Sequence, residues 1–197
     1  MATKLALTFV LALALPACAL AATVHVRVEG RTRTIFAPTT VTVTAATPLE
    51  ALEQASIEGE FYYHVTTTAF GPYVDQIGRY PGSGSSGWVF KVDNASPPVG
   101  ADKLQLKDGD TVLWYYATFG PAGGPPTLQV AATKGGCYSV VAYDDNGKPT
   151  AVTGLVWHVG SKHAIAGATG KQFCPGPHRG LLVRATAPAA VRSNAVK

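Results

Sequence analysis

Charged side chains are scarce in this sequence, and they are not clustered. Asp, Glu, Lys and Arg make up 14% of the 197 residues, and the formal net charge of +4 is spread along the chain without a run of Lys or Arg. Proteins that bind nucleic acid or anionic lipid need clustered positive charge. We therefore expect no nucleic-acid partner.

The sequence also lacks the motifs of several enzyme classes. It has no Gly-x-Ser-x-Gly elbow, no phosphate-binding loop and no dinucleotide fingerprint. The five histidines form neither a helical i, i+4 pair nor a zinc-type spacing with cysteine. Paired catalytic carboxylates leave no fixed signature, so an exported enzyme stays as a third hypothesis. We predict a protein that is not an enzyme, without catalytic residues, metal or cofactor.

One apolar run stands out, and it lies at the N-terminus. Lys4 precedes Leu5–Leu15, and Ala19-Leu20-Ala21 offers a small-residue cleavage site, which is the pattern of a signal peptide over residues 1–22. A membrane span needs about 20 apolar residues, so no transmembrane segment is predicted. Leu15-Pro16-Ala17-Cys18 resembles a bacterial lipobox, which leaves acylation of Cys18 as an alternative. The protein is expected to be secreted or otherwise extracytoplasmic.

The chain has three cysteines, and Cys18 is lost from the count by cleavage or by acylation. The exported chain then keeps Cys137 and Cys174. An even pair in an oxidising compartment predicts a disulfide. A catalytic thiol is the rival interpretation, which no nearby arrangement of His with Asn or Asp supports.

Apolar periodicity predicts strands and one helix in the N-terminal half. Residues 23–28 and 39–44 alternate with period two and are predicted to form a hairpin. Thr47-Pro48-Leu49-Glu50 is a capping box that begins a helix, which Gly59 ends. Further strands are predicted at 61–68, 73–78, 88–92 and 111–119. This order favours an α+β domain of the β-grasp type, with a mixed sheet and one helix.

The stretch 120–126, GPAGGPP, has the composition of a linker. Beyond it, short apolar runs predict a small all-β sandwich, and Asn146-Gly147 predicts a hairpin turn with positive φ at both residues. The predicted organisation is a signal peptide at 1–22, a β-grasp domain at 23–119, a Gly/Pro linker at 120–126, a β-sandwich at 127–190 and a tail at 191–197.

The stretch KDGDTVLWYY, residues 107–116, is either an acidic metal loop or a tight turn before a strand. A calcium loop needs further oxygen ligands at alternating positions, which are missing here. We therefore predict a turn in which Asp108 and Asp110 accept hydrogen bonds from local backbone N–H groups and Gly109 has positive φ. The following strand is apolar on both faces, so both should be covered. The helix covers one face, which leaves a ligand, a partner or the C-terminal sandwich for the other.

A series of short motifs in the N-terminal half resembles a known family. The motifs are Gly87-Trp88-Val89-Phe90-Lys91-Val92-Asp93-Asn94, Val99-Gly100-Ala101, Leu106-Lys107-Asp108-Gly109-Asp110 and Trp114-Tyr115-Tyr116. Residues 23–119 resemble the transcobalamin-like C-terminal domain, a β-grasp module of animal cobalamin carriers and of exported bacterial proteins. The resemblance implies this fold and a ligand-facing surface. In the carriers a helical barrel holds the other side of cobalamin, and nothing in this chain resembles that barrel.

The C-terminal half resembles, more loosely, prealbumin-like or immunoglobulin-like modules of bacterial surface proteins. The resemblance is carried by Gly154-Leu155-Val156, Gly167-Ala168-Thr169-Gly170 and Pro175-Gly176-Pro177-His178. It implies a spacer or a stabilising fold.

The resemblance marks Trp88, Val99 and Gly100 as candidate ligand-binding residues. Tyr62, Tyr63, Tyr73, Tyr80 and Tyr115 are added because aromatic rings stack on flat ligands, although a place in the core is the favoured interpretation for each aromatic. The leading prediction is an exported, non-enzymatic binding protein whose aromatic sheet face takes a small molecule, with cobalamin as one candidate, or another exported protein. The alternative is a structural or adhesive surface module without a small ligand.

Overall fold

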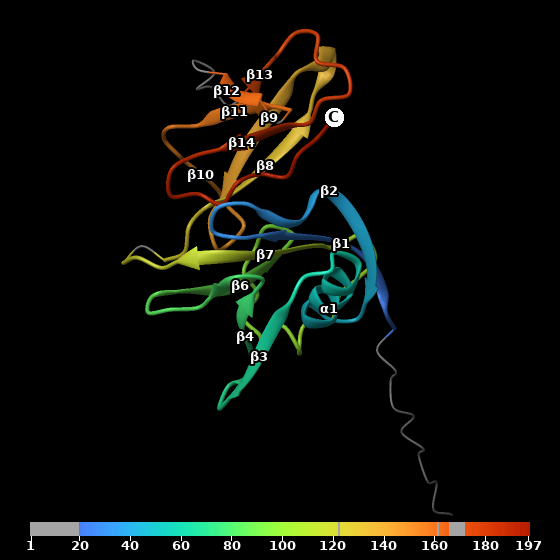
Figure 1. Cartoon of the computed structure of the whole chain (residues 1–197), viewed down its shortest axis with the longest axis vertical. Helices are drawn as coiled ribbons and strands as arrows, with labels where there is room; N and C mark the ends of the chain where they lie inside the picture. Colours follow the sequence, from blue (N-terminus) through green and yellow to red (C-terminus); the bar gives the residue numbers. More distant parts are fainter. Residues whose placement is uncertain (1–19, 122, 161, 166–171) are drawn as a thin grey trace, which may run out of the picture.

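The computed structural model describes residues 20–121, 123–160, 162–165 and 172–197, and this part of the chain is built mainly from strands (Figure 1). The predicted signal peptide lies almost wholly outside the described residues, as do residues 167–170 of the second resemblance. One α-helix occurs in the described part, and no helix there has the length and apolar character of a membrane span. A β-rich fold with one helix is consistent with the predicted α+β class.

A four-stranded sheet organises the N-terminal half, in the order β2-β1-β7-β6. Its strands are β1 (Ala22–Glu29), β2 (Thr34–Ala45), β6 (Ser86–Val92) and β7 (Thr111–Thr118). β1 pairs with β2 in the predicted antiparallel hairpin and runs parallel to β7, which is antiparallel to β6. β2 and β6 are therefore the two edges of this sheet.

The helix α1 (Pro48–Glu58) packs on one face of the sheet through its buried residues Ala51, Leu52 and Ala55. The side chain of the N-cap Thr47 accepts a hydrogen bond from the N–H of Glu50 at 3.2 Å, as predicted. The Glu50 carboxylate accepts from the N–H of Ala46 at 2.8 Å, one residue earlier than in a standard capping box.

The two aspartates of the turn before β7 accept one backbone hydrogen bond within the turn and one from β1. The carboxylate of Asp110 accepts from the N–H of Lys107 at 2.9 Å, and that of Asp108 accepts from the N–H of Thr23 at 2.8 Å. Gly109 has a φ of 87°, which favours glycine. The tight-turn interpretation of this stretch is confirmed, but Asp108 accepts from β1 and not from a local N–H, so that part of the prediction was wrong.

A smaller sheet lies beside the main one. It consists of β3 (Tyr63–Thr68), β4 (Gly71–Ile77) and β5 (Tyr80–Pro81), in that order. The β3–β4 hairpin extends away from the body of the molecule, and its tip carries the fully exposed Phe70 (Figure 1).

The C-terminal half is all-β in its described part, apart from a 3-10 turn at Lys134–Gly136. One sheet contains β8 (Thr127–Ala132), β9 (Tyr138–Tyr143), β10 (Pro149–Thr150) and β13 (Gln172–Phe173), and a second contains β11 (Val156–Val159), β12 (Lys162–Ile165) and β14 (Val183–Thr186). Trp157 is fully buried in their core and stacks on Phe173. In the turn before β10 only Gly147 has positive φ, so the prediction of positive φ at Asn146 as well was wrong.

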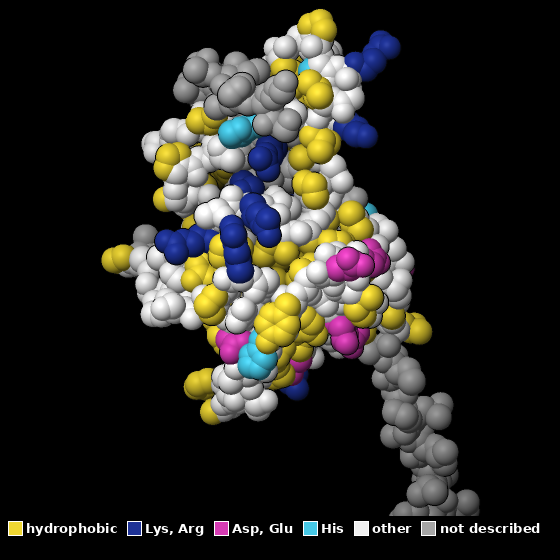
Figure 2. All heavy atoms as spheres, in the orientation of Figure 1, with side chains coloured by type: hydrophobic (Ala, Val, Ile, Leu, Met, Phe, Trp, Pro, Cys, Tyr) yellow, Lys and Arg dark blue, Asp and Glu magenta, His cyan; other side chains and the backbone are white. Residues whose placement is uncertain are grey.

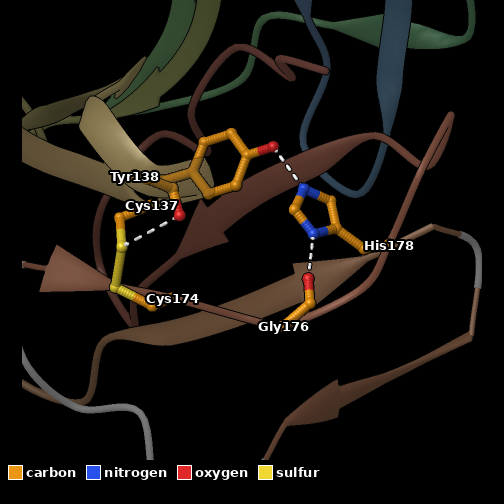
Figure 3. Close-up of a disulfide and its surroundings, with 6 residues drawn as sticks. Cys137, Tyr138, Cys174, Gly176 and His178 are labelled. Carbon is orange, nitrogen blue, oxygen red and sulfur yellow. Dashed lines mark hydrogen bonds between the residues drawn. A yellow bond between two sulfur atoms is a disulfide. The ribbon is translucent and has the colours of Figure 1, made fainter.

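The predicted disulfide between Cys137 and Cys174 is present (Figure 3). It joins the residue before the start of β9 to the residue after the end of β13. Beside it, the hydroxyl of Tyr138 is hydrogen-bonded to Nε2 of His178. Since a carbonyl only accepts, Nδ1 of His178 donates to the C=O of Gly176. This pair of hydrogen bonds ties the loop after β13 to β9.

The C-terminal half covers the face of the main sheet that α1 leaves open (Figure 1). Leu113, Tyr115 and Ala117 of β7 form a buried cluster with Val191. The buried carboxylate of Glu29 accepts a hydrogen bond from Arg192 at 2.9 Å, which adds an ion pair to this junction. Of the three candidates for the second face, the chain's own C-terminal half is the one that lies there. The division into two domains at 120–126 stays a prediction.

Candidate ligand-binding cavity

A cavity of about 360 Å³ with a mainly apolar lining lies along β6. This volume is within the range of small-molecule sites, at its lower end. The wall of β6 is formed by Trp88, Val89 and Phe90. One facing wall comes from β4, with Pro72, Tyr73 and Val74, and another comes from the loop after β6, with Ser96, Pro97, Gly100 and Ala101. The lining is completed by Leu49, Trp114, Tyr115, Phe119 and Asp145.

The two indole rings of the lining are held in place by their N–H groups, and Phe90 is held by packing against one of them. The indole N–H of Trp88 donates to the C=O of Tyr80 at 2.8 Å, and that of Trp114 donates to the C=O of Pro48 at 3.1 Å. The ring of Phe90 lies against Trp114 with centroids 5.1 Å apart. Because both indoles are satisfied and packed, this side of the cavity is preorganised.

The mouth of the cavity carries two partly exposed rings, Tyr73 at 41% and Phe119 at 40% exposure. Tyr73 lies across β6 at Gly87, where an added Cβ would stand 2.3 Å from the hydroxyl oxygen of Tyr73. Only glycine permits this approach, which explains the Gly-Trp pair at the start of the strand. Apolar side chains are also exposed elsewhere on the N-terminal half (Figure 2).

The outer edge of β6 has free backbone groups in its middle. The N–H of Phe119 donates to the C=O of Ser85, and the N–H of Asp93 donates to that of Thr111, which fixes the alternation of the antiparallel ladder. Residues 87, 89 and 91 therefore bond to β7, whereas residues 86, 88, 90 and 92 face away from it.

The two ends of this outer edge are closed by local turns. Ser86 exchanges backbone hydrogen bonds with Ser83, and Val92 exchanges them with Ala95. Between these turns, the N–H and C=O groups of Trp88 and Phe90 have no hydrogen-bond partner among the described residues. Four backbone groups thus face the region of the cavity, and buried backbone groups are normally paired.

Asp145 is the one charged residue of the lining, and it comes from the C-terminal half. Its carboxylate accepts from the N–H of Gly124 at 3.2 Å and lies 3.5 Å from Nζ of Lys91. The Lys91 side chain is fully buried and donates to the C=O of Asp144 at 2.7 Å. Burial lowers the pKa of Lys91, while the charge of Asp145 opposes that effect. Lys91 therefore ties the inner side of β6 to the turn that carries Asp145.

The structure brings four of the eight candidate ligand-binding residues together around this cavity: Tyr73, Trp88, Gly100 and Tyr115. Trp88 and Tyr115 are each 1% exposed, and burial raises the pKa of the Tyr115 hydroxyl. Tyr63 and Tyr80 pack at the margin of the N-terminal core. Tyr62 and Val99 are exposed and lie outside the lining.

Several lining residues were missed from the sequence, among them Phe90, Trp114, Pro97 and Asp145. One available signal was the run Trp88-Val89-Phe90, in which three consecutive apolar residues break the alternation of a half-buried strand. Asp145 had no local signal, because its place depends on how the two halves meet.

A second polar cluster lies on β3 and β4, and none of its residues is part of the cavity lining. Nδ1 of His64 is 2.7 Å from the carboxylate of Asp75, which also accepts from the hydroxyl of Thr66. The Thr66 hydrogen bond, followed by that of His64, lowers the pKa of Asp75. Among the described residues no three His, Cys, Asp or Glu side chains gather as a metal site.

Part of the chain, including most of the cavity lining, is similar to a described protein family. Residues 44–118 match the family described as Domain of unknown function (DUF4430), and this segment includes α1, β6 and most of the cavity lining. A crystal structure described as "a putative metal binding protein from Ruminococcus gnavus" is similar at 14% identity, over 48% of this chain and 95% of that chain, with a TM-score of 0.37. That similarity is too weak to support an argument about metal. No curated protein matches the chain.

Proposed function

We propose that this chain is an exported, non-enzymatic binding protein that takes an apolar guest in the cavity along β6. The observation that carries the proposal is the preorganised aromatic wall of Trp88 and Phe90 beside a mouth lined by Tyr73 and Phe119. A disulfide in the C-terminal half supports an oxidising compartment.

Residues 23–119 are proposed to be a transcobalamin-like β-grasp domain. A hairpin of β1 and β2, a parallel pairing of β1 with β7, and a single helix across the sheet support this topology. The C-terminal half is proposed to act as more than a spacer, since it supplies Asp145 to the cavity wall.

The size of the cavity limits the guest. At about 360 Å³ it has room for a small aromatic molecule or a few side chains. A whole corrinoid is far larger, so cobalamin could insert only one edge of its ring system. The proposed guest is therefore an apolar group of modest size.

The binding function is tested with the neutral naphthalene dye prodan and a pair of matched variants. Ser96 lines the cavity and is exposed, so Ser96→Trp should fill the cavity with the loss of the 3.5 Å hydrogen bond from its hydroxyl to Asp145. Ser85→Trp places the same ring on an exposed loop outside the lining. We expect saturable one-to-one binding with a blue-shifted emission, weakened at least about tenfold (1.4 kcal/mol) by Ser96→Trp and unchanged by Ser85→Trp. Absence of saturable binding, or equal binding by both variants, would overturn the proposed function.

Cobalamin and cobinamide are then titrated into the same proteins, with calorimetry and the corrinoid absorption spectrum as readouts. Saturable micromolar binding that Ser96→Trp removes would assign a corrinoid to this cavity. Prodan binding without corrinoid binding would keep the cavity as a binding site and remove cobalamin as its ligand.

A further inference from the structure

We infer that the guest of this cavity is an extended, apolar peptide segment that pairs with the outer edge of β6 as an additional strand. The inference rests on the proposed function and names the class of its ligand. It starts from the four free backbone groups of Trp88 and Phe90, which an apolar ring could cover but could not satisfy.

The spacing of these groups fits a strand. Trp88 and Phe90 are two residues apart on one edge, so their N–H and C=O groups lie about 6.8 Å apart along the strand direction. An antiparallel guest presents its own N–H and C=O groups with the same repeat and forms up to four hydrogen bonds. Because the turns at Ser83–Ser86 and Val92–Ala95 close the ends of the edge, the paired segment is short.

The side chains around the edge favour apolar guest residues on both faces. Phe90 and Trp88 lie on the side of α1, and Val89 lies on the side of the C-terminal half with Tyr115. A strand added here places alternate side chains against these two groups. The guest is therefore apolar at successive positions, as Trp88-Val89-Phe90 itself is.

Charge restricts the guest further. The cavity lining contains Asp145, whose side chain is 39% exposed, and contains no Lys or Arg. Asp102 adds a second carboxylate nearby, since its Oδ1 lies 2.8 Å from where a Cβ of Gly100 would stand. Both carboxylates already pair with a lysine, Asp145 with the buried Lys91 and Asp102 with Lys103, so a basic guest residue is favoured only weakly over an acidic one.

A second copy of this chain is a poorer occupant than a peptide. Paired strands must approach to about 4.8 Å, and the edge of β6 is faced by Pro72–Val74 and by the loop that carries Ser96 and Gly100. Two such recessed edges would bring their flanking walls into collision. A single extended chain enters the space between the walls.

The test is a selection against the purified protein from a displayed library of random nine-residue peptides, followed by synthesis of the enriched sequence. We expect the enriched peptides to have apolar residues at successive positions and a flanking Lys or Arg. We also expect one-to-one binding that is at least tenfold weaker to Ser96→Trp than to Ser85→Trp. Binding should slow amide hydrogen exchange at Trp88 and Phe90. N-methylation of alternate peptide residues should abolish binding in one register and be tolerated in the other, because only one edge of the guest faces β6.

Each other result overturns the inference. No enriched peptide, equal tolerance of both N-methylated registers, or unchanged exchange at Trp88 and Phe90 would rule out strand addition. Concentration-dependent dimers that protect the same two amides would assign the edge to a second copy instead. If prodan still binds and is blocked by Ser96→Trp while peptides fail, the proposed function stands and only the peptide class falls.

Discussion

The two edges of the main sheet are protected in different ways. On β2 the register against β1 shifts around Pro38, which has no N–H, and the C=O of Pro38 accepts a hydrogen bond from Ala195 of the tail at 2.7 Å. On β6 the middle of the edge carries Trp88 and Phe90, with unpaired backbone groups in a recess. Natural sheets usually shield edges with proline, charge or a covering segment, as β2 does. The contrast supports the proposal that the edge of β6 takes a guest.

The largest expected effect separates the two edges by their contribution to stability. Trp88→Ala should lower the free energy of unfolding by about 3–5 kcal/mol, because it removes a buried ring and leaves a cavity. Thr44→Ala on β2 changes an exposed side chain and should stay within about 0.5 kcal/mol. Chemical denaturation measures both. A loss below about 1 kcal/mol for Trp88→Ala would contradict the buried packing of this ring. The large loss that we expect makes Trp88→Ala unsuitable as a variant for binding experiments.

Removal of the disulfide tests whether the edge of β6 depends on the C-terminal half. Replacing Cys137 and Cys174 by Ser opens a loop with a sequence separation of 37 and should cost about 4 kcal/mol on the chain-entropy model. At a temperature where the variant remains folded, prodan affinity should be unchanged, because the bond is remote from the cavity. Thermal unfolding and the dye titration are measured on the same samples. Parallel loss of affinity in the folded variant would show that the bond shapes the site.

Lys91 links the inner side of β6 to the C-terminal half, and its removal should have a smaller effect. Lys91→Met leaves the C=O groups of Tyr143 and Asp144 without their donor, which should cost about 1–2 kcal/mol at pH 7. Lys91→Arg is the control that keeps a charge.

The pH dependence of that difference has a defined sign. Burial lowers the pKa of Lys91 below its usual 10.5, so the unfolded chain holds this proton in a pH window where the folded chain has released it. Unfolding then takes up a proton, and the contribution of Lys91 to stability rises with pH through the window that ends near 10.5. Denaturation of the wild type and Lys91→Met between pH 7 and 10.5 should show a widening difference. A constant difference would mean that the lysine is hydrated in the folded protein.

The finest comparison lies within β6 itself. The amides of Trp88 and Phe90 should exchange with solvent at least about 100-fold faster than those of Val89 and Lys91, which bond to β7. Residue-resolved hydrogen exchange on the free protein measures this alternation. Uniform protection along the strand would mean that the outer edge is already paired.

The sequence was sufficient for features that depend on neighbouring residues. Thr47, Pro48 and Glu50 predicted the start of α1 within one turn, and Asp108, Gly109 and Asp110 predicted a turn that the structure confirms. Two cysteines left after export predicted the disulfide. The cap and the turn have local physical causes, and the disulfide followed from the even number of cysteines left after export.

The cavity could be predicted only in part, because its walls are long-range. Trp88 was found through a motif, but which of its groups would be free depended on the register of β6 against β7. Tyr62 was chosen by residue type, and the structure places it on the surface outside the lining. No periodicity in the sequence shows that the turn at Asp145 meets Gly124 and Lys91.

The placement of Asp145 has a consequence for how this protein could diversify. A residue of the β9–β10 turn forms part of the wall beside a strand from the other half of the chain. Insertions or substitutions in that turn would alter which guests are accepted while every residue of β6 stays the same. In the proposed binding protein, selectivity can therefore change through the C-terminal half while the strand that presents the hydrogen-bonding edge stays the same.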